Sequence, residues 1–137
     1  MSELSTSDIC TRAIPPAPTV ACEGDFHMDQ TCRRACELVR SNTLIAQQNV
    51  LCILYSTYRA SMQQQLNSLE AALADCKDHC TDDACKAACD AQWGPQIRQL
   101  QLSWALFREA LNTSWNQAVS AANAAYTTCA TNCCQAN

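Results

Sequence analysis

The sequence of 137 residues predicts an all-α fold, a long antiparallel helical hairpin that is stapled by disulfides at both ends and carries an extended N-terminal arm. Three observations predict this class: mirror-related pairs of cysteines, an 11-residue repeat, and only two glycines and four prolines, too few turn formers for a many-stranded sheet protein. The expected parts are the arm over residues 1–27 and the hairpin over residues 28–137, with its turn at residues 81–84.

Eight of the twelve cysteines form Cys-x-x-x-Cys pairs, whose two thiols lie on one face of a helix. The pairs are Cys32/Cys36, Cys76/Cys80, Cys85/Cys89 and Cys129/Cys133. From the outside inward, the residue numbers of Cys32 with Cys133, Cys36 with Cys129, Cys76 with Cys89 and Cys80 with Cys85 all add up to 165. Residues that face each other across two antiparallel helices have such a constant sum. The cysteines therefore predict a single hairpin, centred between Asp82 and Asp83.

The two helices are expected over residues 29–79 and 83–131. Thr81 or Asp82 is a suitable N-cap for the second helix, because its side-chain oxygen can accept a hydrogen bond from a free backbone amide of the first turn. Gly94-Pro95 is expected to interrupt or kink this helix, since proline removes a backbone donor and clashes with the preceding turn.

The 11-residue repeat places one aromatic side chain in every third turn of the second helix. These aromatics are Trp93, Trp104, Trp115 and Tyr126. The constant sum pairs them with smaller residues, in order Ala72, Ser61, Val50 and Val39. It also pairs Phe107 with Tyr58, and Leu111 with Leu54. Large side chains are therefore expected to pack against small ones in each aromatic layer.

Two chemistries fit four thiols that face each other across a hairpin. Disulfides would link the pairs with the constant sum and clamp both ends, each contributing about 2–4 kcal/mol. Alternatively, each end forms a four-thiolate site for zinc or Cu(I). Disulfides are favoured, because the thiols lie only beside the turn and at the open end, whereas the middle of the predicted core is aromatic and aliphatic.

Cys76-x-x-x-Cys80 and Cys85-x-x-x-Cys89 resemble the twin Cys-x-x-x-Cys framework of α-hairpinin peptides and of the small Tim chaperones of the mitochondrial intermembrane space. Both families bridge the first cysteine to the fourth and the second to the third, which implies the same pairing here. The similarity covers about 14 residues, and the four-residue spacer is shorter than that of the small Tims. No activity is carried over from either family.

Four cysteines remain outside the mirror: Cys10, Cys22, Cys52 and Cys134. Residues 13–18, Ala-Ile-Pro-Pro-Ala-Pro, favour an extended arm rather than a helix. If this arm folds back along the first helix, Cys10–Cys52 together with Cys22–Cys134 is geometrically possible. Cys10–Cys22 is the simpler pairing, and bridges to another molecule are also open.

Apolar residues on the first helix extend beyond what one seam between two helices can bury. Residues 41–69 contain a single charged residue, Arg59. A solvated helix of this length normally carries many Lys and Glu residues. We therefore expect an assembly surface that contains Leu44, Ile45, Leu51, Ile53 and Tyr55. The alternative is that the arm covers these side chains within one molecule.

The expected function is structural: a self-assembling subunit of a filament, sheath or other extracellular assembly. The alternative is a cytosolic cysteine-rich bundle that binds zinc or stores Cu(I). A chaperone or inhibitor hairpin is a third possibility. Catalysis is not expected, because the two histidines form no Ser/His/Asp or Cys/His constellation, and no cofactor is indicated.

Partners and compartment follow from charge and cysteine content. A net charge of −4 argues against nucleic acid as a partner, and no apolar stretch has the length of a membrane span. A homo-oligomer or filament is the expected partner state. Twelve cysteines indicate an extracellular or other oxidising compartment. Residues 1–8 lack the basic and apolar regions of a signal peptide, so a removed signal or another export route is implied.

Overall fold

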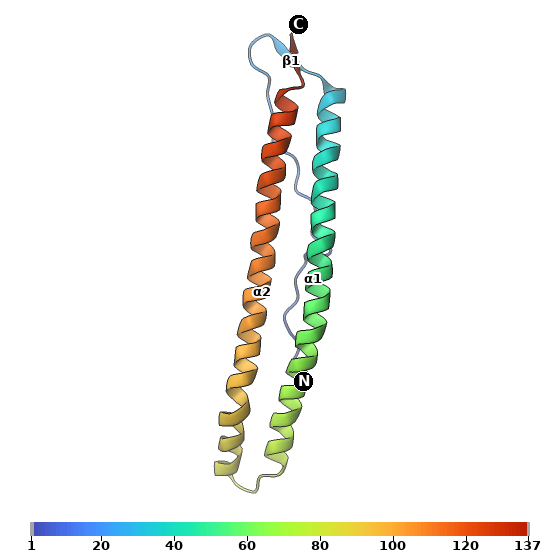
Figure 1. Ribbon diagram of the computed structural model, residues 1–137. Helices are drawn as coiled ribbons and strands as arrows, with labels where there is room; N and C mark the ends of the chain where they lie inside the picture. Colours follow the sequence, from blue (N-terminus) through green and yellow to red (C-terminus); the bar gives the residue numbers. More distant parts are fainter. Residues whose placement is uncertain (1, 137) are drawn as a thin grey trace. The chain divides into compact units, whose positions relative to one another are not determined.

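The computed structural model describes residues 2–136 and contains two long helices that form an antiparallel hairpin (Figure 1). Helix α1 spans Gln30–Asp78, and helix α2 spans Asp83–Thr131. The chain divides into two compact units. Unit 1 contains residues 2–7 and Ile53–Leu111, and unit 2 contains Asp8–Cys52 and residues 112–136. The predicted all-α hairpin is confirmed, and each unit contains an antiparallel stretch of both helices.

Both helices begin at an aspartate N-cap. The Oδ1 atom of Asp29 accepts hydrogen bonds from the backbone amides of Thr31, at 3.0 Å, and Cys32, at 3.3 Å. The Oδ1 atom of Asp82 accepts one from the amide of Cys85, at 2.8 Å. Each carboxylate thus satisfies amides that have no partner within the helix, and its charge favours the positive end of the helix dipole.

Helix α2 continues through Pro95, so the expected interruption at Gly94-Pro95 is wrong. Proline at this position removes the hydrogen bond to the carbonyl of Ala91. Ala91 and Pro95 are both exposed, and water can therefore hydrogen-bond the freed carbonyl.

A short two-stranded sheet in unit 2 was not predicted. Strand β1, Phe26–Met28, pairs antiparallel with strand β2, Cys134–Ala136, and His27 lies opposite Gln135. The amide of Asp29 also donates to the carbonyl of Cys133 at 3.0 Å. Strands of three residues are too short to show an alternating pattern, which is why the sequence does not reveal them.

Between residues 40 and 66 of α1 and between residues 100 and 126 of α2, the buried side chains follow the 11-residue repeat, with alternating steps of four and seven residues. On α1 they are Arg40, Leu44, Leu51, Tyr55, Met62 and Leu66. On α2 they are Leu100, Trp104, Leu111, Trp115, Ala122 and Tyr126. When the first residue of the α1 set is paired with the last residue of the α2 set, and so on inward, the two residue numbers of every pair add up to 166. Because an 11-residue repeat fits three turns, the buried stripe stays on one side of each helix.

Three of the four expected layer partners of the aromatics are wrong by one residue. Val39 is 66% exposed, Val50 is 52% exposed, and Ser61 is also exposed. In the pairs whose residue numbers add up to 166, Trp104 is paired with Met62 instead of Ser61. In the same way, Trp115 is paired with Leu51 instead of Val50. The physical reason is the N-terminal arm, which occupies one side of the hairpin in each unit and draws the buried stripe toward itself.

The aromatic cluster of unit 1 contains one predicted pair. The ring centroids of Tyr58 and Phe107 lie 4.2 Å apart, as their sum of 165 predicts. Trp104 lies 5.8 Å from Tyr55 and 5.6 Å from Phe107. Leu54, the expected partner of the buried Leu111, is 51% exposed. Tyr58 and Leu54, the α1 members of these two pairs, therefore lie on an exposed side of α1 in unit 1.

Six disulfides use all twelve cysteines. Unit 1 contains Cys76–Cys89 and Cys80–Cys85, and unit 2 contains Cys32–Cys133, Cys36–Cys129, Cys10–Cys52 and Cys22–Cys134. The four mirror-related bridges are the pairs whose numbers add up to 165. The arm cysteines pair with Cys52 and Cys134 of the same chain, not with each other. Six bridges indicate an oxidising compartment.

Non-reducing mass spectrometry tests this pattern. The intact chain is expected to be lighter than the reduced chain by twelve hydrogens, two for each of six bridges. A proteolytic fragment that spans residues 76–89 should contain two bridges. Alkylation of any cysteine without prior reduction would contradict the pattern.

Replacement of neighbouring residues tests the register of the core. Leu51→Ala removes a side chain that is 4% exposed, so the free energy of unfolding is expected to fall by about 2–5 kcal/mol. Val50→Ala, the matched control, truncates an exposed side chain and should change it by less than about 1 kcal/mol. Denaturant unfolding of the oxidised protein measures both. If Val50→Ala lowered the free energy of unfolding more than Leu51→Ala, the pairing whose residue numbers add up to 165 would be the correct one.

Candidate interaction surface

The arm segment of unit 1 is held by side chains that hydrogen-bond its backbone. The amide of Leu4 donates to Gln63 Oε1 at 2.8 Å, and the carbonyl of Leu4 accepts from Arg59 Nη2 at 2.8 Å. The carbonyl of Ser5 accepts from Trp104 Nε1 at 3.0 Å. The Leu4 side chain is 4% exposed. The segment is extended and makes no sheet, so these side chains satisfy backbone groups that would otherwise be buried without partners.

The arm segment of unit 2 is held in the same way. Gln48 Nε2 donates to the carbonyls of Ile9, at 3.0 Å, and Arg12, at 2.6 Å. Ile9 is fully buried, and the adjacent Cys10 is bridged to Cys52. Burial of a side chain of this size contributes about 1.5–3 kcal/mol. The arm is therefore a packed part of unit 2 rather than a free tail.

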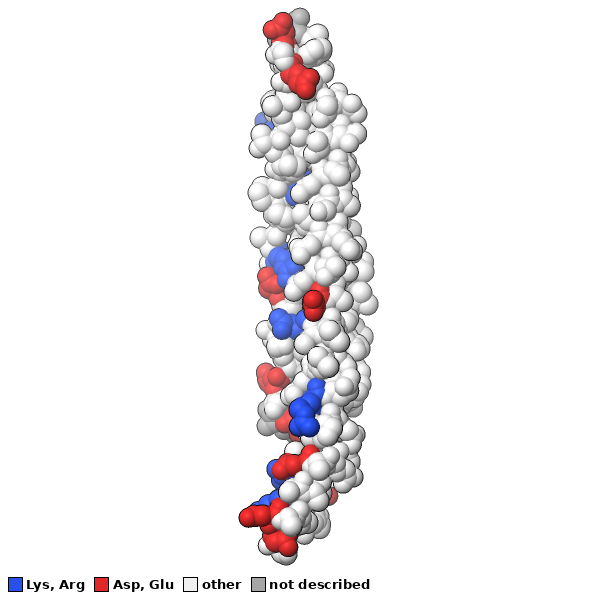
Figure 2. All heavy atoms as spheres, turned by 90° about the vertical axis from the view of Figure 1, so that its left-hand side faces the viewer, with Lys and Arg blue, Asp and Glu red and all other residues white. Residues whose placement is uncertain are grey.

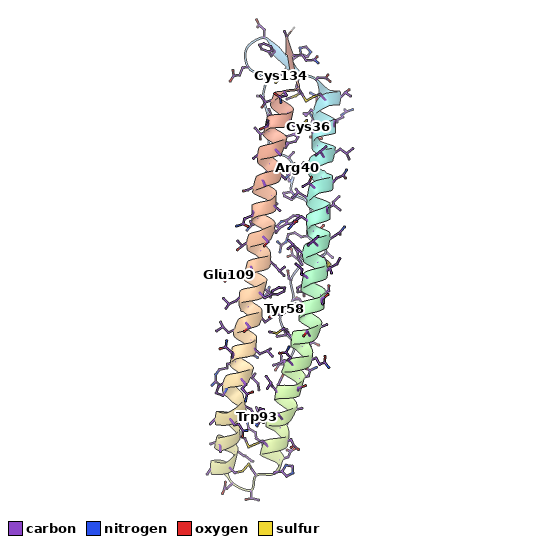
Figure 3. All side chains as sticks on the ribbon, in the orientation of Figure 1. Cys36, Arg40, Tyr58, Trp93, Glu109 and Cys134 are labelled. Carbon is purple, nitrogen blue, oxygen red and sulfur yellow. A yellow bond between two sulfur atoms is a disulfide. The ribbon has the colours of Figure 1, made fainter. Side chains whose placement is uncertain are left out.

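Arg40 is the central polar contact between the arm and the helices of unit 2. Its Nη1 and Nη2 atoms donate to the carbonyls of Pro15, at 2.8 Å, and Pro16, at 3.2 Å. Its Nε atom donates to Asn123 Oδ1 on α2 at 2.9 Å. Arg40 is 5% exposed and is labelled in Figure 3. One guanidinium thus joins α1, α2 and the proline-rich part of the arm.

The structure corrects three of the five residues expected in an assembly surface. Leu44, Leu51 and Tyr55 are buried within their own units. The Tyr55 hydroxyl also accepts a hydrogen bond from the amide of Ser7 in the arm, at 3.0 Å. The arm supplies the packing that two helices alone lack, so these residues are unavailable to a partner. Ile45, 45% exposed, and Ile53, 65% exposed, remain on the surface.

Unit 2 has an apolar groove with exposed valines on its α1 side. The groove has a volume of about 350 Å³. Val39 and Thr43 line it from α1, and small side chains line it from α2, namely Ala118, Ala121 and Ala125. Val50 lies eleven residues after Val39 and therefore on the same face of α1. The sequence does not reveal this surface, because the constant sum of 165 places Val39 and Val50 in the seam.

The helical segments around this groove are almost free of charge. Residues 41–52 and 112–136 contain no Lys, Arg, Asp or Glu. Unit 2 as a whole has four basic and five acidic residues, a net charge of −1. On the face shown in Figure 2, uncharged residues cover most of the surface and charged residues form small groups. Arg40 is the one charged residue that lines the groove, and it is occupied by the arm.

Unit 1 presents a different surface. Its groove, about 1130 Å³ in volume, is lined largely by Gln and Ser side chains, among them Ser61, Gln65, Gln96, Gln99 and Ser103. Leu102 and Leu106 are exposed elsewhere on α2. Unit 1 has five basic and eight acidic residues, a net charge of −3. The groove of unit 1 is thus more polar than the groove of unit 2, and the net charge of unit 1 is more negative.

Among residues 2–136, two titratable groups have shifted pKa values. The backbone carbonyl of Asp75 lies 2.8 Å from Nδ1 of His79, and this hydrogen bond, with the Asp75 carboxylate nearby, raises the pKa of the imidazole. The hydrogen bonds from Arg12 lower the pKa of the Asp8 carboxyl. Neither group lines the unit 2 groove, so the state of this surface does not depend on their titration.

Comparisons with models of known families, with curated proteins and with solved structures find no match. The likeness to α-hairpinins and small Tim chaperones therefore rests on the cysteine framework alone. Within residues 2–136, neither helix has a stretch long and apolar enough to cross a bilayer.

Replacement of Arg40 tests how the arm is held. Arg40→Ala removes three hydrogen bonds of a buried guanidinium, to the carbonyls of Pro15 and Pro16 and to Asn123 Oδ1, so the free energy of unfolding is expected to fall by about 2–4 kcal/mol. Arg34→Ala is the matched control, because Arg34 is an exposed arginine on the same helix; it should change stability by less than about 0.5 kcal/mol. Equal effects in denaturant titrations would show that the Arg40 contacts contribute nothing.

Proposed function

We propose that this protein is a non-catalytic structural subunit that associates with copies of itself through the groove face of unit 2. This face is defined by Val39, Thr43 and Val50 on α1 and by Ala118, Ala121 and Ala125 on α2. The observation that carries the proposal is that Val39 stays exposed while it lines a groove of small residues, with the exposed Val50 eleven residues further along the same face of α1. Isolated exposed apolar residues are ordinary, but such a set beside an apolar groove is typical of an interaction site.

A second copy suits this face better than a charged partner. The face offers no free charge that would attract an acidic or basic protein, and the low net charge of unit 2 causes little repulsion between copies. Val39 of one copy can enter the alanine-lined groove of the other, and a two-fold arrangement makes this contact twice. The small alanines permit close approach of the facing helix.

The finer expectation is a filament, sheath or other extracellular assembly. A two-fold contact through unit 2 closes a dimer, so a filament needs a second contact. The exposed Leu102 and Leu106 of unit 1 are candidates for it. The six disulfides support a role outside reducing compartments. The arm, which is bridged to its own chain, takes no part in linking copies.

Val39→Lys tests the proposal. Burial of a valine contributes about 1.5 kcal/mol, roughly tenfold in affinity, and a two-fold interface contains the residue twice. The dissociation constant of the dimer is therefore expected to rise by about a hundredfold, as measured by light scattering over a concentration series. Leu102→Lys is the matched control, because Leu102 is an exposed residue of unit 1; it should leave the dimer intact.

Two results would contradict the proposal. One is a wild-type protein that stays monomeric up to high concentration. The other is equal weakening by Val39→Lys and Leu102→Lys. Electron microscopy of concentrated wild-type protein and of Leu102→Lys tests the filament separately, since only the second contact should be lost in the variant.

A further inference from the structure

The groove of unit 1 and the arm lie on opposite sides of α1. Gln63, which binds the arm, directly follows the buried Met62, and Ser61, which lines the groove, directly precedes it. Successive residues of a helix are about 100° apart, so the side chains of Gln63 and Ser61 point about 200° apart. On α2, likewise, Trp104 contacts the arm and its neighbour Ser103 lines the groove. One side of unit 1 is therefore covered by an extended segment, and the other side carries the groove.

Both walls of this groove carry uncharged side chains that form hydrogen bonds. On α1 they are Ser61, Gln64, Gln65 and Ser68, and on α2 they are Gln96, Gln99 and Ser103. Among residues 2–136, no charged side chain lines the groove. A helix face that contacts only water normally carries Lys and Glu residues. The composition of the two walls is therefore unusual for a merely solvated surface.

Several of these polar groups have no partner within the described part of the chain. The side chains of Gln64, Gln99 and Ser103 form no hydrogen bond with any of residues 2–136. The floor between the walls is apolar, because Met62 and Leu100 are buried at 5% and 8% exposed. A glutamine amide supplies one acceptor and two donors. The groove thus combines free amide groups on its walls with an apolar floor.

Gln63 shows how a glutamine of this helix binds an extended peptide. Its Oε1 atom accepts a hydrogen bond from the amide of Leu4 at 2.8 Å, and its Nε2 atom donates to the carbonyl of Ser2 at 2.9 Å. One side chain thus supplies the two hydrogen bonds that a neighbouring strand would otherwise give. The next two residues of α1, Gln64 and Gln65, present the same chemical group to the groove.

We propose that the groove of unit 1 binds an extended, uncharged peptide segment of a partner protein through these glutamine side chains. An extended backbone presents its amides and carbonyls to both sides, and amide side chains stand on both walls of the groove. An apolar side chain of the segment packs on Met62 and Leu100, as the buried Leu4 packs in the arm. A charged segment is disfavoured, because its charge would lose water without gaining a partner.

The length of the groove sets the length of the bound segment. The lining residues of α1 extend from Tyr58 to Leu69, which is about 16 Å of helix. At about 3.3 Å per residue, five residues of extended chain span this distance. Tyr58, labelled in Figure 3, lies at one end of the groove, and its ring is 38% exposed. The ring offers a flat apolar surface to the end of the segment.

The probe is the hexapeptide Ser-Gln-Leu-Ser-Thr-Ser with blocked ends, which is the arm sequence over residues 2–7 made uncharged by Glu3→Gln. It is titrated into the oxidised, isotope-labelled full chain, and the NMR signals of the side-chain amides are followed. Saturable shifts of the groove glutamines are expected. Gln64→Ala and Gln99→Ala should each raise the dissociation constant about fivefold, the equivalent of one hydrogen bond. Gln101→Ala is the matched control, because Gln101 is exposed on α2 outside the groove, and it should leave the constant unchanged.

A second peptide, methylated at the backbone nitrogen of its leucine, tests whether the backbone is recognised. Loss of this donor should weaken binding about fivefold or more. Equal binding of both peptides would overturn the proposal, as would shifts confined to Gln63 and Arg59, which would show exchange with the tethered arm. The absence of saturation by the first peptide at millimolar concentration would also overturn it, including the case in which a neutral oligosaccharide, cellohexaose, shifts the groove signals instead. These measurements do not involve the groove face of unit 2, so their outcome is separate from that of self-association.

Discussion

The hydrogen bonds from helix side chains to the backbone of the arm are the interaction on which the rest of the structure depends. Two helices share a single seam, and a chain with so few charges has more apolar surface than one seam can bury. The arm provides a third packing element in each unit. An extended segment brings its own polar backbone into the core, so it packs there only because Gln, Arg, Tyr and Trp side chains supply the missing partners.

This arrangement also explains which parts of the fold the sequence could predict. The hairpin and the pairing of its eight mirror-related cysteines follow from cysteine positions, because a bridge can join only residues that face each other. That these cysteines form disulfides rather than metal sites is favoured by the aromatic and aliphatic middle of the predicted core. The core register does not follow. Its sum of 166, rather than 165, depends on which side of the helices the arm occupies, and nothing periodic in residues 1–27 indicates that side.

The candidate surface shows the same limit. Ile45 and Ile53 were expected on the surface and lie there, whereas Leu44, Leu51 and Tyr55 are covered by packing within the chain. Val39 and Val50 were assigned to the seam and are exposed instead. Spacing along a helix predicts that residues share a face. It cannot predict which of two neighbouring faces is covered when the cover is an irregular segment elsewhere in the chain.

The Cys22–Cys134 bridge has a mechanical consequence. Tension applied to the two ends of the chain travels along the shortest covalent path, from the arm through this bridge to strand β2. Residues 10–22 are held at both ends, by Cys10–Cys52 and Cys22–Cys134, so only the residues before Cys10 and after Cys134 can be drawn out, and fully extended they span about 40 Å. The helices, although they contain most of the chain, are bypassed. Tension on the ends of the chain would therefore detach only the first residues of the arm, while the two bridges keep the rest of the arm against its own helices.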